Sequence, residues 1–161
     1  MKRLWAPWRM AYIEASKDEG PEDGCLFCDR LAAGDDEASL ILVRSPTAFV
    51  MLNAFPYNPG HLLIAPLRHV AEVEDLEPAE MADAAELLQH GIRALKTVSG
   101  PDGFNVGMNL GRVAGAGVPG HLHWHVVPRW DGDTNFMATV GETRVLPESL
   151  ADTYAKLKPR Y

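Results

Sequence analysis

The stretch His121-Leu-His-Trp-His-Val-Val-Pro128 decides how the rest of the sequence is interpreted. Its histidines alternate with apolar residues, and it ends in two β-branched residues and a proline, a composition that favours a strand over a helix. Side chains at positions i, i+2 and i+4 of a strand project from one face. We therefore expect His121, His123 and His125 to line one surface of a sheet, with the apolar residues between them facing the core.

A glycine-rich segment, Asn109-Leu-Gly-Arg-Val-Ala-Gly-Ala-Gly-Val-Pro-Gly120, comes directly before this stretch. Glycine lets the backbone approach a ligand closely, and successive backbone N–H groups can bind phosphate oxygens. Gly115, Gly117 and Val118 are therefore candidate phosphate-binding residues. A glycine-rich segment alone is weak evidence, because most such segments are only loops.

Farther from the histidines, the chain supplies more strands and helices. Turn residues separate three β-rich runs, at residues 39–44, 47–53 and 61–65, and these indicate an antiparallel meander. Two more strands are expected, at residues 104–110 and 121–129. Short helices are expected at residues 25–31 and, more weakly, at residues 146–157.

The one long helix is predicted between residues 77 and 99. Apolar residues from Met81 to Val98 recur there at three- and four-residue steps, with Pro78 suited to the first turn and Gly100 to the C-cap. Strands on both sides of a single helix predict an α+β fold, with an antiparallel sheet of about five strands and the helix packed on one face.

The composition, 47% hydrophobic and 23% charged, is that of one compact domain over residues 1–161. We divide it into an N-terminal arm and loop (1–24), a core (25–130) and a C-terminal extension (131–161). The net charge of −7 argues against binding to nucleic acid or to an anionic membrane. There is no secretory signal and no apolar window long enough for a membrane helix, so we expect a cytoplasmic protein.

The two cysteines, Cys25 and Cys28, have a spacing used in cytosolic proteins mainly for metal or redox chemistry. Two thiolates do not close a tetrahedral zinc site, so a zinc site needs two further ligands. A thioredoxin-like redox pair is an alternative, although no βαβ unit precedes Cys25. An inert pair of small buried residues is the third interpretation.

The histidine row also allows more than one chemistry. A neutral imidazole is a nucleophile near pH 7 and forms a covalent phosphoramidate with phosphorus. Flanking imidazoles can hold its tautomer, donate to phosphate oxygens and protonate a leaving group. The alternatives are a zinc site with three histidine ligands and a purely structural role.

Taken together, these residues resemble the histidine triad family of nucleotide hydrolases and transferases, whose signature is His-x-His-x-His after a glycine-containing loop. The resemblance extends to Asn53-Ala-Phe-Pro-Tyr-Asn-Pro-Gly-His61-Leu-Leu-Ile-Ala-Pro66 and to Arg68-His69, and so covers roughly residues 25–130. It implies an α+β homodimer or higher homo-oligomer that binds a purine nucleotide or dinucleoside polyphosphate in a cleft.

The resemblance also implies residue roles. His123 would be the nucleophile, His125 and Asn109 would contact the phosphate or the leaving group, Asn53 would bind the ribose hydroxyls, and His61 would support the histidine cluster. The expected walls of the base pocket are Phe27, Met51 and Leu52.

One departure from the family pattern concerns the phosphate contact. The family often has Gln and then Ser or Thr where this chain has Gly117 and Val118. A hydroxyl contact to phosphate is thereby lost, which leaves the contact to backbone N–H groups.

Family members with a cysteine pair complete a structural zinc site with two histidines, and the matching positions here are His69 and His121. The resemblance therefore implies Zn²⁺ bound by Cys25, Cys28, His69 and His121, beside the reaction and not part of it. His90, in the long helix, is not expected to be a ligand.

The ends of the chain narrow the branch of the family. Trp5-Ala-Pro-Trp-Arg-Met-Ala-Tyr12 and the run from Pro128 to Met137 are similar to a bacterial subgroup of diadenosine tetraphosphate phosphorylases. The N-terminal aromatics either contact substrate or anchor the arm to the body or to a second subunit.

The function expected is nucleotidyl transfer on diadenosine polyphosphates through an adenylyl-His123 intermediate. One alternative is a hydrolase of dinucleoside polyphosphates or nucleoside phosphoramidates, with water as the acceptor. The other is a nucleotide-binding protein without catalytic activity.

Overall fold

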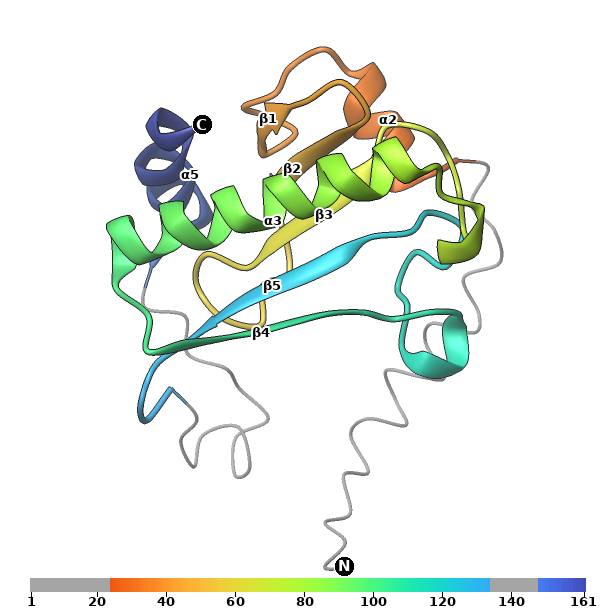
Figure 1. Cartoon of the computed structure of the whole chain (residues 1–161). Coiled ribbons are helices and arrows are strands. Elements are labelled where there is room, and N and C mark those ends of the chain that lie inside the picture. The colour runs from red at the N-terminus through yellow and green to blue at the C-terminus, as the bar shows by residue number, and fades with distance from the viewer. Residues whose placement is uncertain (1–23, 134–147) are drawn as a thin grey trace, which may run out of the picture.

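The computed structural model describes residues 24–133 and 148–161. Figure 1 shows a five-stranded sheet with one long helix across one face, which confirms the predicted α+β fold. The N-terminal aromatics and residues 134–147 lie outside the described residues. No helix in the described part of the chain is long and apolar enough to cross a membrane.

The sheet is antiparallel throughout, in the order β1-β2-β3-β5-β4. Its strands are β1 (Ile41–Arg44), β2 (Ala48–Leu52), β3 (Leu62–Pro66), β4 (Gly103–Met108) and β5 (Trp124–Arg129). The predicted meander of the first three strands is confirmed. Because β5 lies between β3 and β4, His125 sits opposite Leu63 on one neighbour and Gly107 on the other.

Three α-helices and three short 3-10 turns complete the described fold. They are α2 (Leu26–Ala32), η1 (Val73–Asp75), α3 (Pro78–Ser99), η2 (Arg112–Ala114), α5 (Leu150–Leu157) and η3 (Lys158–Arg160). Helix α3 begins with Pro78 in its first turn and ends at Gly100, which has φ +54°. Both predicted ends of the long helix are confirmed.

The buried face of α3 is shifted from the apolar stripe predicted for it. Met81 is 39% exposed, whereas Leu87 and Gly91 face the sheet. A Cβ on Gly91 would lie 2.9 Å from Cδ1 of Leu62, so the helix packs unusually close to β3. Small side chains therefore define this face as much as large apolar ones do.

The sheet separates two apolar clusters. The helix-side cluster packs Val50, Leu62 and Val126 against α3. The opposite cluster contains Phe27 of α2 and Met51 of β2. Since Val126 belongs to the helix side, the alternation of β5 places His125 on the α2 side.

The regular strand begins later than predicted. Strand β5 starts at Trp124, so His121 and His123 precede it. The side chains of His121 and His123 nevertheless lie on one side of the chain, because both rings have their centroids 5.0 Å from that of Phe27. The backbone N–H of Leu122, between them, donates to the carbonyl of Val70 (2.7 Å). The row of histidines thus spans the entry to the strand.

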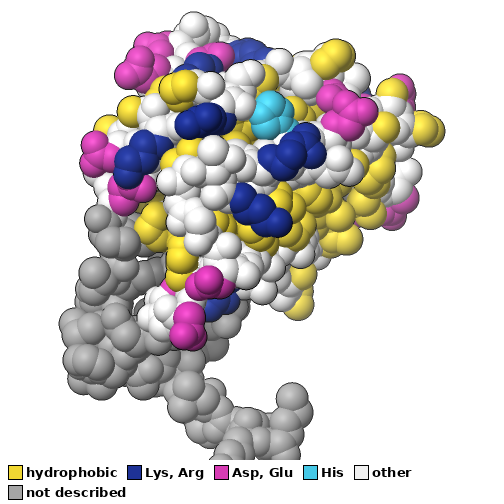
Figure 2. Space-filling view, turned by 60° about the vertical axis from the view of Figure 1, so that its left-hand side comes forward, with side chains coloured by type: hydrophobic (Ala, Val, Ile, Leu, Met, Phe, Trp, Pro, Cys, Tyr) yellow, Lys and Arg dark blue, Asp and Glu magenta, His cyan; other side chains and the backbone are white. Residues whose placement is uncertain are grey.

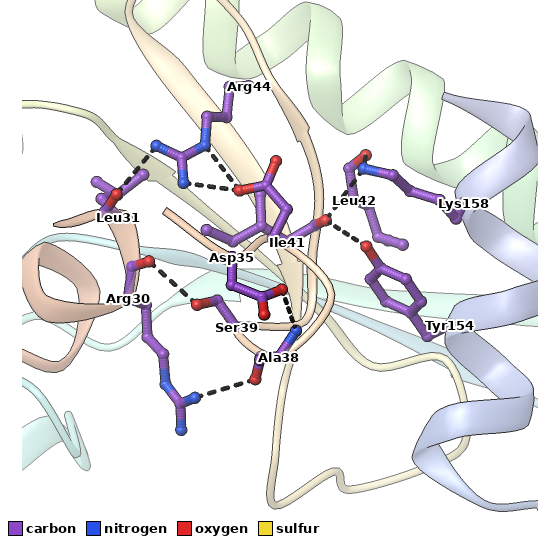
Figure 3. A network of polar contacts seen from close by, with 11 residues as sticks. Arg30, Leu31, Asp35, Ala38, Ser39, Ile41, Leu42, Arg44, Tyr154 and Lys158 are labelled. Atoms are coloured by element: carbon purple, nitrogen blue, oxygen red, sulfur yellow. Dashed lines mark hydrogen bonds and ion pairs between the residues drawn. The ribbon is translucent and has the colours of Figure 1, made fainter. Parts of the chain in front are cut away.

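The outer edge of β1 is covered by the C-terminal segment. Figure 3 shows Tyr154 Oη donating to the carbonyl of Ile41 (3.0 Å) and Lys158 Nζ donating to that of Leu42 (2.8 Å). An uncovered edge strand offers its backbone to another chain. At the other side of the sheet, β4 has no strand on its outer edge among the described residues.

The surface is not uniformly acidic despite the net charge of −7. In Figure 2, with the α5 side brought forward, Lys and Arg side chains gather around a histidine. Exposed basic residues of α3 and of the C-terminal segment include Arg93, Lys96, Lys156, Lys158 and Arg160. Net charge alone therefore does not describe this face.

Candidate active site

The three histidines gather where the chain enters β5, on the face of the sheet opposite α3. The ring of Phe27, from α2, lies with its centroid 5.0 Å from that of His121 and 5.0 Å from that of His123. The rings of His123 and His125 meet edge to face at 4.9 Å. The predicted common surface for the three imidazoles is therefore present.

His123 is held in one tautomer. Its Nδ1 lies 2.8 Å from the backbone carbonyl of His121, and a carbonyl oxygen only accepts, so Nδ1 carries the proton and Nε2 keeps a lone pair. The side chain is 6% exposed, and burial lowers the pKa of His123 below its ordinary value. A neutral imidazole with a free Nε2 lone pair is the form needed for nucleophilic attack.

His125 is held in the opposite tautomer by its neighbours. The backbone N–H of Tyr57 donates to Nδ1 of His61 (3.1 Å), so the proton of His61 is on Nε2. This Nε2–H donates to Nδ1 of His125 (2.9 Å), which leaves the proton of His125 on its Nε2. No residue in the described part of the chain accepts that proton, and burial lowers the pKa of His125 to about 4.

Neighbouring histidines thus present opposite functions. His123 offers a lone pair and His125 offers an N–H, although both imidazoles are neutral. The difference comes from two backbone groups, the His121 carbonyl and the Tyr57 N–H, and not from any difference in residue type. A nucleophile next to a proton donor is the arrangement required for displacement at phosphorus with protonation of the leaving group.

Asn53 lies behind His61. Its Nδ2 is 3.3 Å from Nδ1 of His61, and its Oδ1 accepts from the backbone N–H of Phe55 (2.9 Å). These contacts fix the orientation of the amide and support the His61 tautomer. The expected contact of Asn53 with ribose hydroxyls stays a prediction.

A groove of about 520 Å³ runs beside His125 between β4 and the Tyr57 loop. Asn109 lines it, and its Nδ2 donates weakly to the carbonyl of Gly115 (3.4 Å). Gly115 has φ +98°, a conformation that favours glycine. The end of β4 and the glycine-rich loop are therefore tied together at the mouth of the groove.

Of the other residues predicted to contact the phosphate or the base, most lie on the α2 side of the sheet and one does not. Gly117 is exposed, and Val118 packs against the cluster around Phe27. Met51 belongs to this same cluster. Leu52 does not reach the site, because its side chain packs on the α3 side of the sheet; consecutive strand residues point to opposite faces.

Two residues that the sequence reasoning missed are Tyr57 and Asn58. The ring of Tyr57 stacks on His125 with centroids 6.0 Å apart, and Asn58 is 7% exposed. Their segment belongs to the stretch that resembles the family, but it gave these two residues no role beyond the turn Asn58-Pro59-Gly60. An asparagine before such a turn gives no sign of whether it is buried.

The predicted metal ligands form one cluster beside the triad. One ligand atom each from Cys25, Cys28, His69 and His121 lies within 4.8 Å of the others. The sulfurs of Cys25 and Cys28 are 3.3 and 3.7 Å from His121 Nδ1, and Cys28 Sγ is 3.4 Å from His69 Nδ1. Tetrahedral zinc, with bonds of about 2.3 Å to sulfur and 2.0 Å to nitrogen, separates S and N by about 3.5 Å.

The tautomer of His121 also suits a metal. Its Nε2 donates to the backbone carbonyl of Pro66 (2.9 Å), so the lone pair is on Nδ1, which faces the two sulfurs. A ligand histidine whose other nitrogen donates to a carbonyl is the usual arrangement in zinc sites. The four residues therefore fit zinc, and the carbonyl of His121 also holds His123.

Comparison with known proteins identifies the family of the chain. The family model described as HIT domain matches residues 35–132. A zinc-bound histidine triad family protein from Mycobacterium smegmatis superposes with a TM-score of 0.69 and 24% identity, over 85% of this chain and 92% of that one. The chain therefore belongs to the histidine triad family and is an enzyme of its nucleotidyltransferase and hydrolase class.

Individual relatives are also similar. The chain is 43% identical to the AP-4-A phosphorylase of Mycobacterium tuberculosis over 157 residues, which are 95% of this chain and 80% of that protein. It is 30% identical to the adenosine 5'-monophosphoramidase hnt1 of Schizosaccharomyces pombe, over 65% of this chain and 74% of that protein.

Proposed function

We propose that the chain catalyses nucleotidyl transfer on diadenosine polyphosphates, with phosphate as the preferred acceptor. The observation that carries this proposal is the pair of fixed, opposite tautomers at His123 and His125. The similarity to a protein named AP-4-A phosphorylase supports the choice of substrate.

In the first step, Nε2 of His123 attacks the α-phosphorus of diadenosine tetraphosphate. The new N–P bond forms as the bond from phosphorus to the bridging oxygen breaks, and ATP leaves. His125 Nε2–H stabilises or protonates the departing oxygen. The product is adenylyl-His123, a covalent phosphoramidate.

In the second step, an oxygen of inorganic phosphate attacks the same phosphorus and the N–P bond breaks. This releases ADP and restores the His123 lone pair. With water as the acceptor the product is AMP, and the enzyme is then a hydrolase. The Nδ1–H bond to the His121 carbonyl (2.8 Å) stabilises the imidazole in both steps.

The proposed position of the substrate follows from the glycine-rich loop, Asn109, Asn53 and the α2 side of the sheet. The phosphates lie near the glycine-rich loop, where the backbone N–H groups of Gly117 and Val118 are available in place of a side-chain hydroxyl. Asn109 contacts the phosphate or the leaving group. The adenosine lies on the α2 side, where Phe27 and Met51, which are 1% and 3% exposed, form the floor of its pocket, with Asn53 at the ribose.

A structural zinc ion belongs to this proposal. Cys25, Cys28, His69 and His121 would hold it, and the related Mycobacterium smegmatis protein is described as zinc-bound. When bound, the ion supplies no chemistry to the substrate but fixes the segment before β5. The chain's own His121 carbonyl then orients His123.

The assembly proposed is a homodimer in the cytoplasm. Among residues 24–133 and 148–161, no strand pairs with the outer edge of β4, and Val106 on this strand is 45% exposed. An exposed apolar edge strand is suited to pairing with a second copy.

Incubation with diadenosine tetraphosphate, with and without inorganic phosphate, tests the function. ADP and ATP that form only with phosphate support phosphorolysis, whereas AMP formed regardless of phosphate supports hydrolysis. The relative named adenosine 5'-monophosphoramidase gives a second candidate. No reaction of the dinucleotide, with cleavage of adenosine phosphoramidate, would contradict the proposal and favour that candidate.

A further inference from the structure

The turn that carries His61 is tied to β5 by a polar cluster outside the histidine row. Nδ2 of Asn58 donates to the backbone carbonyl of Pro128 (2.9 Å) and to Oδ2 of Asp133 (2.8 Å). Both amide hydrogens are used, so the buried side chain has one orientation. Asn58 thereby fastens the turn to the strand on which His125 lies.

Asp133 is a fixed acceptor for Asn58. Its carboxylate accepts from Nε and Nη2 of Arg129 (2.5 and 2.8 Å) and from the backbone N–H of Trp130 (3.2 Å). A bidentate arginine–carboxylate pair has a specific geometry, and the Asp133 side chain is only 10% exposed. Arg129 is held in turn by Asn105 on β4 (2.7 Å).

The turn connects Asn58 to His61 through backbone hydrogen bonds. The backbone carbonyl of Asn58 accepts from the His61 N–H (3.1 Å), and Gly60 adopts φ +78° within the turn. Tyr57, the residue before Asn58, directs its own N–H at His61 Nδ1 (3.1 Å). The position of Asn58 therefore sets the shorter of the two donor contacts that keep His61 Nδ1 unprotonated, 3.1 Å from the Tyr57 N–H against 3.3 Å from Asn53 Nδ2.

We propose that Asn58 and Asp133 are positioning residues that fix the proton of His125 on Nε2, acting through the Tyr57 N–H and His61. This inference rests on the proposed function, because it assigns that proton to the leaving group. When the anchor is lost, the Tyr57 N–H moves away from His61 Nδ1 and the weaker contact from Asn53 Nδ2 (3.3 Å) remains, so the form of His61 with its proton on Nδ1 becomes populated beside the Nε2–H form. His125 then spends part of its time with Nδ1 protonated, and its Nε2 has no proton to donate.

The leaving group gives the first test. An amine leaving from adenosine phosphoramidate must be protonated, whereas nitrophenolate leaving from the p-nitrophenyl ester of AMP needs no proton. General acid catalysis contributes about 10²- to 10⁴-fold. For Asn58→Ala and Asp133→Ala we expect kcat/KM on the phosphoramidate, which reports the step in which the leaving group departs, to fall about tenfold or more, with kcat/KM on the ester changed by less than about twofold.

Asp83→Ala is the matched control. Asp83 is also a carboxylate that anchors a turn, accepting from Ser45 Oγ (2.7 Å) and from the backbone N–H of Thr47 (2.8 Å), but it lies on α3 away from the triad. The Asp83→Ala variant should be less stable than the wild type, but its activities on the phosphoramidate and on the ester should change by the same factor. An equal loss on both substrates in Asn58→Ala and Asp133→Ala would overturn the proposal, as would unchanged phosphoramidate turnover.

The tautomers give a second test that needs no turnover. Long-range ¹H–¹⁵N spectra of the wild type should show His125 with Nε2 protonated and Nδ1 unprotonated, and both positioning variants should show a mixture. A pure Nε2–H tautomer in both variants would refute the positioning role. A wild type that cleaves neither nucleotide would instead refute the proposed function, while the spectra still decide the tautomer.

Discussion

Replacing Gly60 with Ala tests the turn that carries His61. An L-residue at the left-handed φ of +78° costs about 1–2 kcal/mol. The added Cβ would also lie 2.7 Å from Cδ2 of Leu95, a core residue that is 1% exposed. Overpacking of this kind costs about 1–3 kcal/mol, so the free energy of unfolding should fall by about 2–5 kcal/mol.

Urea unfolding of Gly60→Ala and Gly34→Ala measures the two costs separately. Gly34 has φ +71°, but a Cβ there would meet nothing within 4 Å, so its substitution carries only the backbone cost of about 1–2 kcal/mol. The kcat of Gly60→Ala should also fall, because the turn supplies His61. Equal losses of stability in the two variants would refute the close packing of the turn on Leu95.

Two further predictions concern protonation and metal. Burial lowers the pKa of His125 to about 4 in the folded protein, whereas an unfolded histidine titrates near about 6.5. As the pH falls from about 6.5 to about 4, the unfolded chain binds protons that the folded chain does not, so the free energy of unfolding falls. Urea titrations at several pH values should show a smaller fall in the free energy of unfolding for His125→Gln than for the wild type, and an equal fall would contradict this explanation. Cys28→Ser should lose zinc and melt at a lower temperature than the wild type, as measured by metal analysis and thermal unfolding. A wild type that contains no metal and melts at the same temperature as Cys28→Ser would rule out the zinc site.

The sequence predicted those parts of the fold that depend on local pattern. Pro78 and Gly100 mark the ends of α3 because each suits a helix end for a local conformational reason. The insertion of β5 between β3 and β4 was not predicted, since strand order depends on contacts between distant segments. Met81 was wrongly predicted to lie on the buried face of α3. Gly91 lets the helix approach Leu62 closely along a neighbouring face, and a hydrophobic pattern does not reveal a contact made by glycine.

The site was predicted to a similar depth. The alternation of histidines predicted three imidazoles on one face. The family resemblance predicted that His69 lies beside the two cysteines, and the structure confirms this cluster. Leu52 was misplaced although the two-residue period of a strand already separates it from Met51. The tautomers depend mainly on backbone groups of Tyr57 and His121, which no residue identity encodes.

Trapping of the covalent intermediate tests the central claim most directly. Wild-type enzyme is mixed with diadenosine tetraphosphate labelled at the α-phosphorus, quenched in base within milliseconds, digested, and its peptides are sequenced by mass spectrometry. We expect the label on Nε2 of His123, and for His123→Ala no label and a turnover lower by about 10⁴-fold, with nucleotide binding retained. Label on another residue, or full turnover by His123→Ala, would contradict the assignment of His123 as the nucleophile.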